Sequence, residues 1–226
     1  DIEQIEEEYY KRFLNYIPNK KQELFHIAGL TAQERLITGG NRSGKTFCGE
    51  EEFSAHWTGI YNENWKGYRF DKPVRCWVAG KTASLISETI QKDLFGDKEQ
   101  NLRGMIHSSL IKEKKKSGNS EMYRTVYIRH VSGGSSKVTF KTYEEGREAF
   151  QAGKIDLALM DEEPPFNIYQ ECKMRTMATD NSSRGMIVVC STPLKGYSDF
   201  FNYFMDDRHP EEVKDSRWHA HITWED

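Results

Sequence analysis

The stretch Gly39-Gly40-Asn41-Arg42-Ser43-Gly44-Lys45-Thr46 decides the fold of this chain. It matches the pattern G-x-x-x-x-G-K-[ST] at every specified position. Residues 35–38, just before it, predict a strand, and a helix is expected from residue 45 to about 57. In that context the backbone N–H groups of the loop turn inward around phosphate oxygens, at a helix N-terminus that favours negative charge. The sequence therefore predicts a nucleotide-phosphate site.

Each part of this loop has an expected role. The Lys45 ammonium can reach the β- and γ-phosphates, and the Thr46 hydroxyl can ligate Mg²⁺. The preceding loop residues are expected to surround the nucleotide: Gly39, Gly40, Asn41, Arg42, Ser43 and Gly44. The plainer alternative is a glycine-rich turn with a solvated lysine, which a complete match disfavours. A second Gly-Lys-Thr at residues 80–82 is given no nucleotide role, because Arg75 stands where the first glycine belongs.

A second polar cluster follows the apolar run of residues 155–160, which is typical of a strand buried on both faces. Asp161, Glu162 and Glu163 stand at its end, and two prolines at 164–165 stop the strand. Beside a phosphate loop, the first acid is expected to support Mg²⁺ and the next to orient or deprotonate the attacking water. We therefore assign Asp161 to the metal and Glu162 to the base, with Glu163 as its competitor.

Two weaker signals accompany these clusters. Ser191, Thr192 and Pro193 follow an apolar run over residues 186–190. They can sense the γ-phosphate and pass on its loss, or they form an ordinary turn, and both interpretations remain open. Gln22 precedes the loop, and its amide offers a donor and an acceptor that match the N6/N7 edge of adenine. A single glutamine on a helix is otherwise most often a surface residue.

The remaining pattern favours an α/β fold with a mostly parallel sheet covered by helices on both sides. In such sheets ligands bind at the carboxyl ends of the strands, where the polar clusters lie. Further strands are expected at 73–80, 125–131, 137–143 and 218–224, and further helices at 2–17, 21–28 and 83–95.

Composition excludes several classes of protein. The chain has 226 residues with 32 basic and 35 acidic side chains, so its net charge of -3 exerts no bulk attraction on nucleic acid. Residues 112–120, Lys-Glu-Lys-Lys-Lys-Ser-Gly-Asn-Ser, are interpreted as a basic loop that is either solvated or a contact for phosphate.

The four cysteines lack metal-site spacing and are expected to be reduced and mostly buried. No apolar run is long enough to span a membrane.

Taken together, these residues resemble the ATPase domain of a tailed-bacteriophage terminase large subunit, a P-loop NTPase of the ASCE type. Gln22, the loop of residues 39–46, the Asp161-Glu162 pair and the turn at 191–193 occur in the order seen in that family. The stretch of residues 140–147, leading to 155–165, is especially similar. The phosphate loop alone occurs in many families, whereas the combination is much more specific.

The resemblance implies a role for each of these residues. Gln22 would read adenine, Lys45 and Thr46 would hold phosphate and Mg²⁺, Asp161 would support Mg²⁺, and Glu162 would activate water. Ser191 and Thr192 would belong to the segment that couples hydrolysis to movement. Arg42 would sense or stabilise the γ-phosphate from within the loop. An arginine finger is expected from a neighbouring subunit, with Arg147 as the candidate and Arg124 and Arg129 behind it.

The resemblance also implies partners and a setting. The family forms a homo-oligomeric ring on the portal and pumps double-stranded DNA into a procapsid, together with a small terminase subunit. It would act in the host cytoplasm and transiently at the procapsid portal, with no membrane contact. Residues 1–226 would form one ATPase domain, whose first 30 residues carry the adenine-binding motif. Because there is no room for the C-terminal nuclease, we expect an isolated and initially monomeric ATPase half that does not cut DNA.

Other functions share part of this chemistry. A superfamily 2-like helicase or translocase uses the same Gln, Lys and Asp-Glu groups but normally needs a second motor domain. A structural or switch module without hydrolysis is disfavoured by the intact Lys45 and Asp161-Glu162. A GTP switch would carry N-K-x-D, and residues 19–22 fail at the last position. A small-molecule kinase remains possible, although an Asp-Glu pair suits water attack better.

Overall fold

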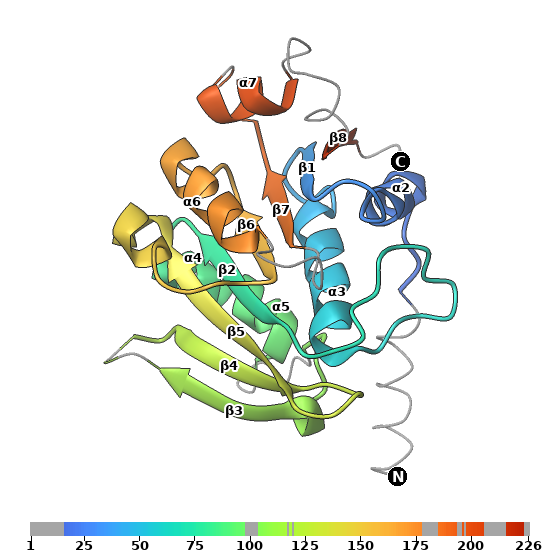
Figure 1. Ribbon diagram of the computed structural model, residues 1–226, viewed down its shortest axis with the longest axis vertical. Coiled ribbons are helices and arrows are strands. Elements are labelled where there is room, and N and C mark those ends of the chain that lie inside the picture. The colour runs from blue at the N-terminus through green and yellow to red at the C-terminus, as the bar shows by residue number, and fades with distance from the viewer. Residues whose placement is uncertain are drawn as a thin grey trace.

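A computed structural model describes residues 16–97, 104–116, 118, 120–177, 185–193, 196, 198–205 and 216–223 (Figure 1). The expected helix over residues 2–17 lies outside these residues except for its last two, as does Trp224 at the end of the expected last strand.

A twisted sheet forms the centre of the described chain, with the strand order β3-β4-β5-β2-β6-β7-β1-β8. The last six strands in this order, β5-β2-β6-β7-β1-β8, pair in parallel. The other two, β3 and β4, are added antiparallel at the β5 edge. One strand, β7, separates β1 from β6, as expected for a P-loop NTPase of the ASCE type. The strands are β1 (Glu34–Gly39), β2 (Arg75–Gly80), β3 (Ile111–Lys116), β4 (Tyr123–Arg129), β5 (Ser135–Thr142), β6 (Leu157–Asp161), β7 (Met186–Ser191) and β8 (Arg217–Ile222).

Helices cover both faces of the sheet, and each face has its own apolar core. On one face Phe53 and Trp57 of α3 pack with Val78 and Val188, and on the other Ile168 of α6 packs with neighbouring strand residues. Burying both faces explains why the central strands are almost continuously apolar. The helices are α2 (Lys20–Ala28), α3 (Lys45–Thr58), α4 (Ala83–Glu88), α5 (Ile90–Phe95), α6 (Phe166–Thr176) and α7 (Asp199–Met205). Short 3₁₀ turns occupy Ser108–Leu110, Tyr143–Glu145 and Arg147–Phe150.

The expectation of a basic loop after residue 111 is wrong for its first half. Residues 111–116 form the edge strand β3, paired antiparallel with β4 (Figure 1). The lysines still reach solvent, and Lys114 Nζ also lies 4.6 Å and 4.9 Å from the ring centroids of Phe95 and Tyr123. Lysines are common on edge strands because their charge discourages pairing with another chain. The lysine run therefore belongs to the sheet.

Two further differences concern helices. The single helix expected over residues 83–95 is broken at Thr89, whose φ of -113° and ψ of -83° lie outside the helical region. The Thr89 hydroxyl donates to the carbonyl of Leu85, a local bond that competes with regular helix. The helices α6 and α7 were not anticipated. In α6, Phe166, Tyr169 and Cys172 recur at a helical spacing that was available in the sequence.

The expectation for the cysteines is confirmed, because all four are free and buried. No helix in the described part of the chain is both long and apolar enough to cross a membrane.

Candidate nucleotide-binding site

The three polar clusters lie at the carboxyl ends of neighbouring parallel strands. The phosphate loop follows β1, Asp161 ends β6, and Ser191 ends β7, which lies between the other two. The register pairs Asp161 with Cys190 and Thr38 with Ser191, so these strand ends share one edge of the sheet. A ligand at this edge can contact all three clusters at once.

The glycines of the phosphate loop allow close backbone packing. A Cβ atom at Gly39 would lie 2.5 Å from Ser43 Oγ and 2.7 Å from the carbonyl oxygen of Ile222, so a side chain does not fit there. Gly44 is the N-cap of α3 and has a φ of +82°, a conformation that favours glycine. Arg42 also has a left-handed backbone, with a φ of +62°, and its side chain is exposed. Close packing at Gly39 and left-handed backbone at Arg42 and Gly44 thus define a tight loop.

Lys45 and Thr46 open α3, and Asp161 of β6 lies against them. Lys45 is 5% exposed, and its Nζ lies 3.5 Å from the carbonyl oxygen of Gly40, within the loop. The Thr46 hydroxyl donates to Asp161 Oδ1 at 3.0 Å. Burial, reinforced by the charge of Glu162, raises the pKa of Asp161 to about 6, although Thr46 and Lys45 act in the opposite direction. Burial thus favours the neutral form of this carboxyl, and the contacts with Thr46 and Lys45 favour the charged one.

Glu162 lies just past the strand end, where the chain turns. Its φ is +61°, a left-handed conformation that costs a non-glycine residue roughly 1–2 kcal/mol. Two contacts hold it there, because Glu162 N donates to the Cys190 carbonyl at 2.8 Å and Glu162 Oε2 accepts from Thr192 N at 3.2 Å. The turn thus directs the Glu162 carboxylate to the backbone of Thr192, while Asp161 contacts Thr46.

The candidate coupling segment contacts both other clusters. Besides the bond to Glu162, the Thr192 hydroxyl lies 3.5 Å from Asn41 Oδ1 in the phosphate loop. Ser191 is fully buried, and its hydroxyl has no hydrogen-bond partner within the described residues. The turn at Thr192 therefore connects Glu162 to the phosphate loop.

Gln22 lies against the phosphate loop from the side of α2. Its Nε2 donates to the Gly44 carbonyl at 3.2 Å, and its Oε1 accepts from Asn19 N at 2.9 Å. The Asn19 side chain in turn accepts from Gln22 N, which completes a capping box at the start of α2. Gln22 is only 7% exposed, so the sequence-based view of it as a possible surface residue does not apply.

Two of the three candidate arginine fingers, Arg147 and Arg124, are held by carboxylates. Arg147 Nε donates to Glu171 Oε2 at 3.0 Å, while its side chain remains 49% exposed. Arg124 forms a two-point ion pair with Glu145, and Arg129 is exposed at the end of β4. The assignment of Arg147 as the finger stays a prediction.

One residue at this edge was not singled out from the sequence. The Tyr143 hydroxyl lies 3.0 Å from the carbonyl oxygen of Asp161 and 3.2 Å from that of Glu162, so it supports the backbone of the acidic pair. Burial raises the pKa of Tyr143 well above its usual value, which keeps the hydroxyl a proton donor. The similar stretch of residues 140–147 contained this tyrosine, but nothing local indicated which turn it would contact.

Comparison with known proteins identifies the family of this chain. A family model described as terminase large subunit, T4likevirus-type, N-terminal, matches residues 36–226. The chain belongs to this large terminase family. The large terminase subunit of Salmonella phage P22 is 32% identical over 224 residues, covering 88% of this chain and 44% of the relative. The terminase chain described here thus spans less than half the length of that curated relative.

Solved structures show that the terminase fold is shared. The ATPase domain of the Thermus phage P74-26 large terminase aligns with a TM-score of 0.56 at 18% identity, covering 93% of this chain and 82% of that one. The HK97 large terminase aligns with a TM-score of 0.59 at 14% identity, covering 92% and 39%. The large terminase of bacteriophage D6E, solved in complex with ADP, has a TM-score of 0.54 at 13% identity, covering 90% and 45%.

Proposed function

We propose that this chain is the ATP-hydrolysing part of a phage DNA-packaging motor. The observation that carries the proposal is the contact between Thr46 and Asp161, at 3.0 Å, directly beside a complete phosphate loop and next to Glu162. The loop lysine, the hydroxyl, the acid and the base are the four groups that hydrolysis of a nucleoside triphosphate requires. The family and the fold agree with this chemistry.

Nucleotide binding is assigned to the loop and to Gln22. Backbone N–H groups of residues 39–46 would surround the phosphates, with the Lys45 ammonium on the β- and γ-phosphates. Gln22 would read adenine, because its amide nitrogen carries a second N–H and its oxygen a second lone pair beyond the bonds to Gly44 and Asn19. Arg42 would add a positive charge near the γ-phosphate.

The residues present fit a Mg²⁺ ion. Magnesium prefers oxygen ligands, and Thr46 and Asp161 offer a hydroxyl and a carboxylate whose oxygens are 3.0 Å apart. When bound, Mg²⁺ neutralises charge that develops on the phosphate oxygens. Thr46 and Asp161 would hold it, and Lys45 would complete the positive surroundings of the phosphates.

Glu162 would act as the general base toward the attacking water. Its carboxylate accepts from Thr192 N in this structure, so base and coupling turn are already joined. Movement of Glu162 toward the water would release Thr192, and Ser191 and Thr192 would pass the state of the γ-phosphate to the rest of the motor. Arg147 of a neighbouring chain would stabilise the transition state in trans.

The same family relationship supports the larger setting. We propose that the chain acts on double-stranded DNA, in a ring assembled on the portal and with a small terminase subunit, in the host cytoplasm.

Turnover of ATP by the purified chain tests the proposal, with and without double-stranded DNA, over a range of protein concentrations and with Mg²⁺ present or chelated. We expect Lys45→Ala to abolish hydrolysis and to weaken nucleotide binding, because it removes the ammonium group that would contact the β- and γ-phosphates. Lys81→Ala, in the second Gly-Lys-Thr, is the matched control and should hydrolyse ATP normally. Full turnover by Lys45→Ala would remove the phosphate-loop assignment.

A further inference from the structure

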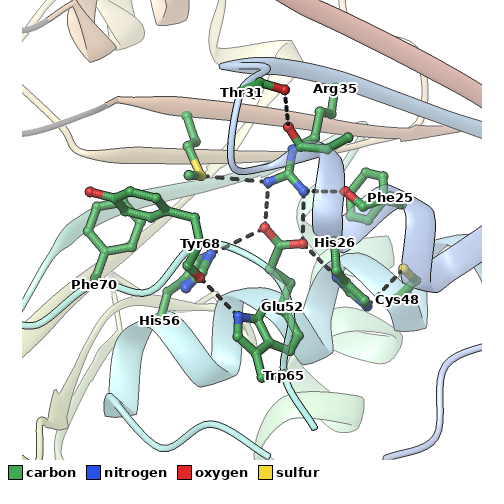
Figure 2. A network of polar contacts seen from close by, with 12 residues as sticks. Phe25, His26, Thr31, Arg35, Cys48, Glu52, His56, Trp65, Tyr68 and Phe70 are labelled. Atoms are coloured by element: carbon green, nitrogen blue, oxygen red, sulfur yellow. Dashed lines mark hydrogen bonds and ion pairs between the residues drawn. The ribbon is translucent and has the colours of Figure 1, made fainter.

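A buried polar cluster joins α2 and β1 to α3 (Figure 2). At its centre the Glu52 carboxylate of α3 is fully buried and forms a two-point ion pair with the Arg35 guanidinium of β1. His26 of α2 contacts Glu52 Oε2 through Nδ1 at 2.7 Å. His56 of α3 contacts Glu52 Oε1 through Nε2 at 3.2 Å. Arg35 also donates to the carbonyl of Phe25 in α2 at 2.8 Å.

The hydrogen bonds of the cluster specify its charges. Burial acts to raise the pKa of Glu52, but the Arg35 charge and the histidine contacts hold it well below its usual value, so Glu52 is an ionised acceptor. His26 must then donate from Nδ1 to Glu52, and its Nε2 lies 3.1 Å from the Tyr16 hydroxyl and 3.6 Å from Cys48 Sγ. These contacts fix the orientation of the His26 ring between α2 and α3.

Polar contacts contribute to the position of α2, beside the apolar packing of Phe25. The helix has nine residues, and its buried side chains are Gln22, Phe25, His26 and Ala28, of which two are polar. A buried ion pair is often no more stabilising than an apolar replacement, and its best-attested use is to specify one arrangement. Both bonds from the cluster to α2, at His26 and at the Phe25 carbonyl, are directional.

The same helix carries the proposed adenine contact. Gln22 lies one turn before His26, and its amide nitrogen is 3.2 Å from the Gly44 carbonyl of the phosphate loop. Glu52 lies two turns after the start of α3, the helix that begins at this loop. The cluster therefore links the two elements between which an adenine nucleotide must fit.

We propose that His26, held by the Glu52–Arg35 pair, is a positioning residue that sets Gln22 at the correct distance from the phosphate loop for adenine. The proposal rests on the proposed function and deepens it. His26 does not touch the nucleotide. Its loss should therefore weaken the binding of the base while leaving the binding of the phosphates unchanged.

Matched variants separate this role from general stability. In His26→Asn the amide N–H lies near the position of Nδ1 and can still donate to Glu52. In His26→Gln the amide N–H lies near the position of Nε2, so the bond to Glu52 is lost. His56→Asn removes the other histidine bond to Glu52 on α3, without touching α2, and controls for the loss of stability. Arg35→Lys keeps the charge beside Glu52 but cannot bridge Glu52 and the Phe25 carbonyl as a guanidinium does.

The experiment measures the Kd of a non-hydrolysable ATP analogue and of inorganic tripolyphosphate, together with the melting temperature, for each variant. We expect His26→Gln to weaken the ATP analogue roughly five- to tenfold, the equivalent of one hydrogen bond. Its tripolyphosphate Kd should stay within about twofold of the wild type. His26→Asn should be close to wild type, and His56→Asn should melt earlier with both Kd values unchanged. Arg35→Lys should repeat the selective loss if His26→Gln does not fold.

Three results for the variants would overturn the inference and leave the proposed function standing. Equal weakening of both ligands by His26→Gln would mean that the cluster only supports the phosphate loop. Unchanged ATP binding in a folded His26→Gln chain would remove the positioning role, and so would equal weakening by His56→Asn. A wild-type chain that binds neither ligand would instead overturn the proposed function, and the inference with it.

Discussion

Glu162 illustrates how single residues are adapted to chemistry in this chain. It has a left-handed backbone that is unfavourable for a glutamate, and two backbone contacts, from Cys190 and Thr192, compensate for it. Such strain is concentrated at functional sites, where the surrounding structure maintains it. Its neighbour Glu163 continues the chain toward the two prolines without a contact of this kind to Thr192 among the described residues. The two adjacent glutamates thus differ in their contact with the Thr192 turn.

We expect Glu162→Gln to bind ATP normally and to hydrolyse it about 10²–10⁴-fold more slowly, because an amide cannot accept the proton of water. Single-turnover rates and the Kd of a non-hydrolysable analogue measure the two properties separately. Glu163→Gln is the matched control and should be milder. If Glu163→Gln were the more damaging change, the roles of the two residues would have to be exchanged.

At the scale of elements, α3 joins the nucleotide site to the core and places three successive glutamates in three environments. Consecutive residues of a helix point about 100° apart, so Glu50, Glu51 and Glu52 face different neighbours. Burial raises the pKa of Glu50 well above its usual value, and neither carboxylate oxygen has a hydrogen-bond partner in the described chain. Burial raises the pKa of Glu51 to about 7. Among the described residues, Glu52 is the one of the three with an ion pair, which it forms with Arg35.

We expect Glu52→Gln to lower the free energy of unfolding by about 3–5 kcal/mol, because it leaves Arg35 buried without a counter-charge. Glu51→Gln, one residue away, should be neutral or stabilising at pH 8. Denaturant unfolding at pH 5 and pH 8 measures both effects.

The pH dependence follows from the sign of each shift. A carboxyl whose folded pKa is raised destabilises the fold as it ionises, so the stability of the wild type relative to Glu51→Gln should fall as pH rises through about 7. The Glu52 contribution is present above the ordinary carboxyl pKa and is lost only as pH falls through its lowered value. The deficit of Glu52→Gln should therefore be similar at pH 5 and pH 8. An equal loss of unfolding free energy in Glu51→Gln and Glu52→Gln would contradict the different environments assigned to these two side chains.

At the scale of the whole molecule, the candidate trans arginine Arg147 lies in the 3₁₀ turn Arg147–Phe150, against α6. Arg147 is half exposed and shares Glu171 with Arg175, whose Nε donates to Glu171 Oε1 at 2.9 Å. A cationic finger supplied by a neighbouring chain can accelerate hydrolysis roughly 10³–10⁵-fold. A dilute chain that lacks this help should be a slow ATPase whose activity per chain rises with concentration.

Mixing inactive variants tests the finger. Glu162→Gln keeps its arginines and Arg147→Ala keeps its base, so we expect a mixture to hydrolyse ATP well above the sum of its parts. Arg175→Ala, which loses a Glu171 partner but not the candidate finger, should retain activity by itself. Simple additivity, under conditions where the wild type associates, would exclude Arg147 and direct attention to Arg124 and Arg129.

The amino-acid sequence by itself determined the phosphate loop, the acidic pair and the mostly parallel sheet. The first two are local patterns: Lys45 and Thr46 follow the glycines of the loop directly, and Asp161 ends an apolar run. The strand–loop–helix order follows from the spacing of apolar residues alone. The expectations for the candidate nucleotide site were accordingly made from short stretches, and the structure brings these stretches to one edge.

Only the tertiary structure decided how distant segments meet. The contact of Thr192 with Glu162 and that of Tyr143 with the same turn arise from strand neighbours far apart in sequence. The lysine run became the edge strand β3 because β4 was available to pair with it. The charge of Glu52 and the raised pKa values of its two neighbours depend on which partners burial leaves within reach. Hydrogen bonding and desolvation are set by neighbours in space, and the sequence pattern records only neighbours along the chain.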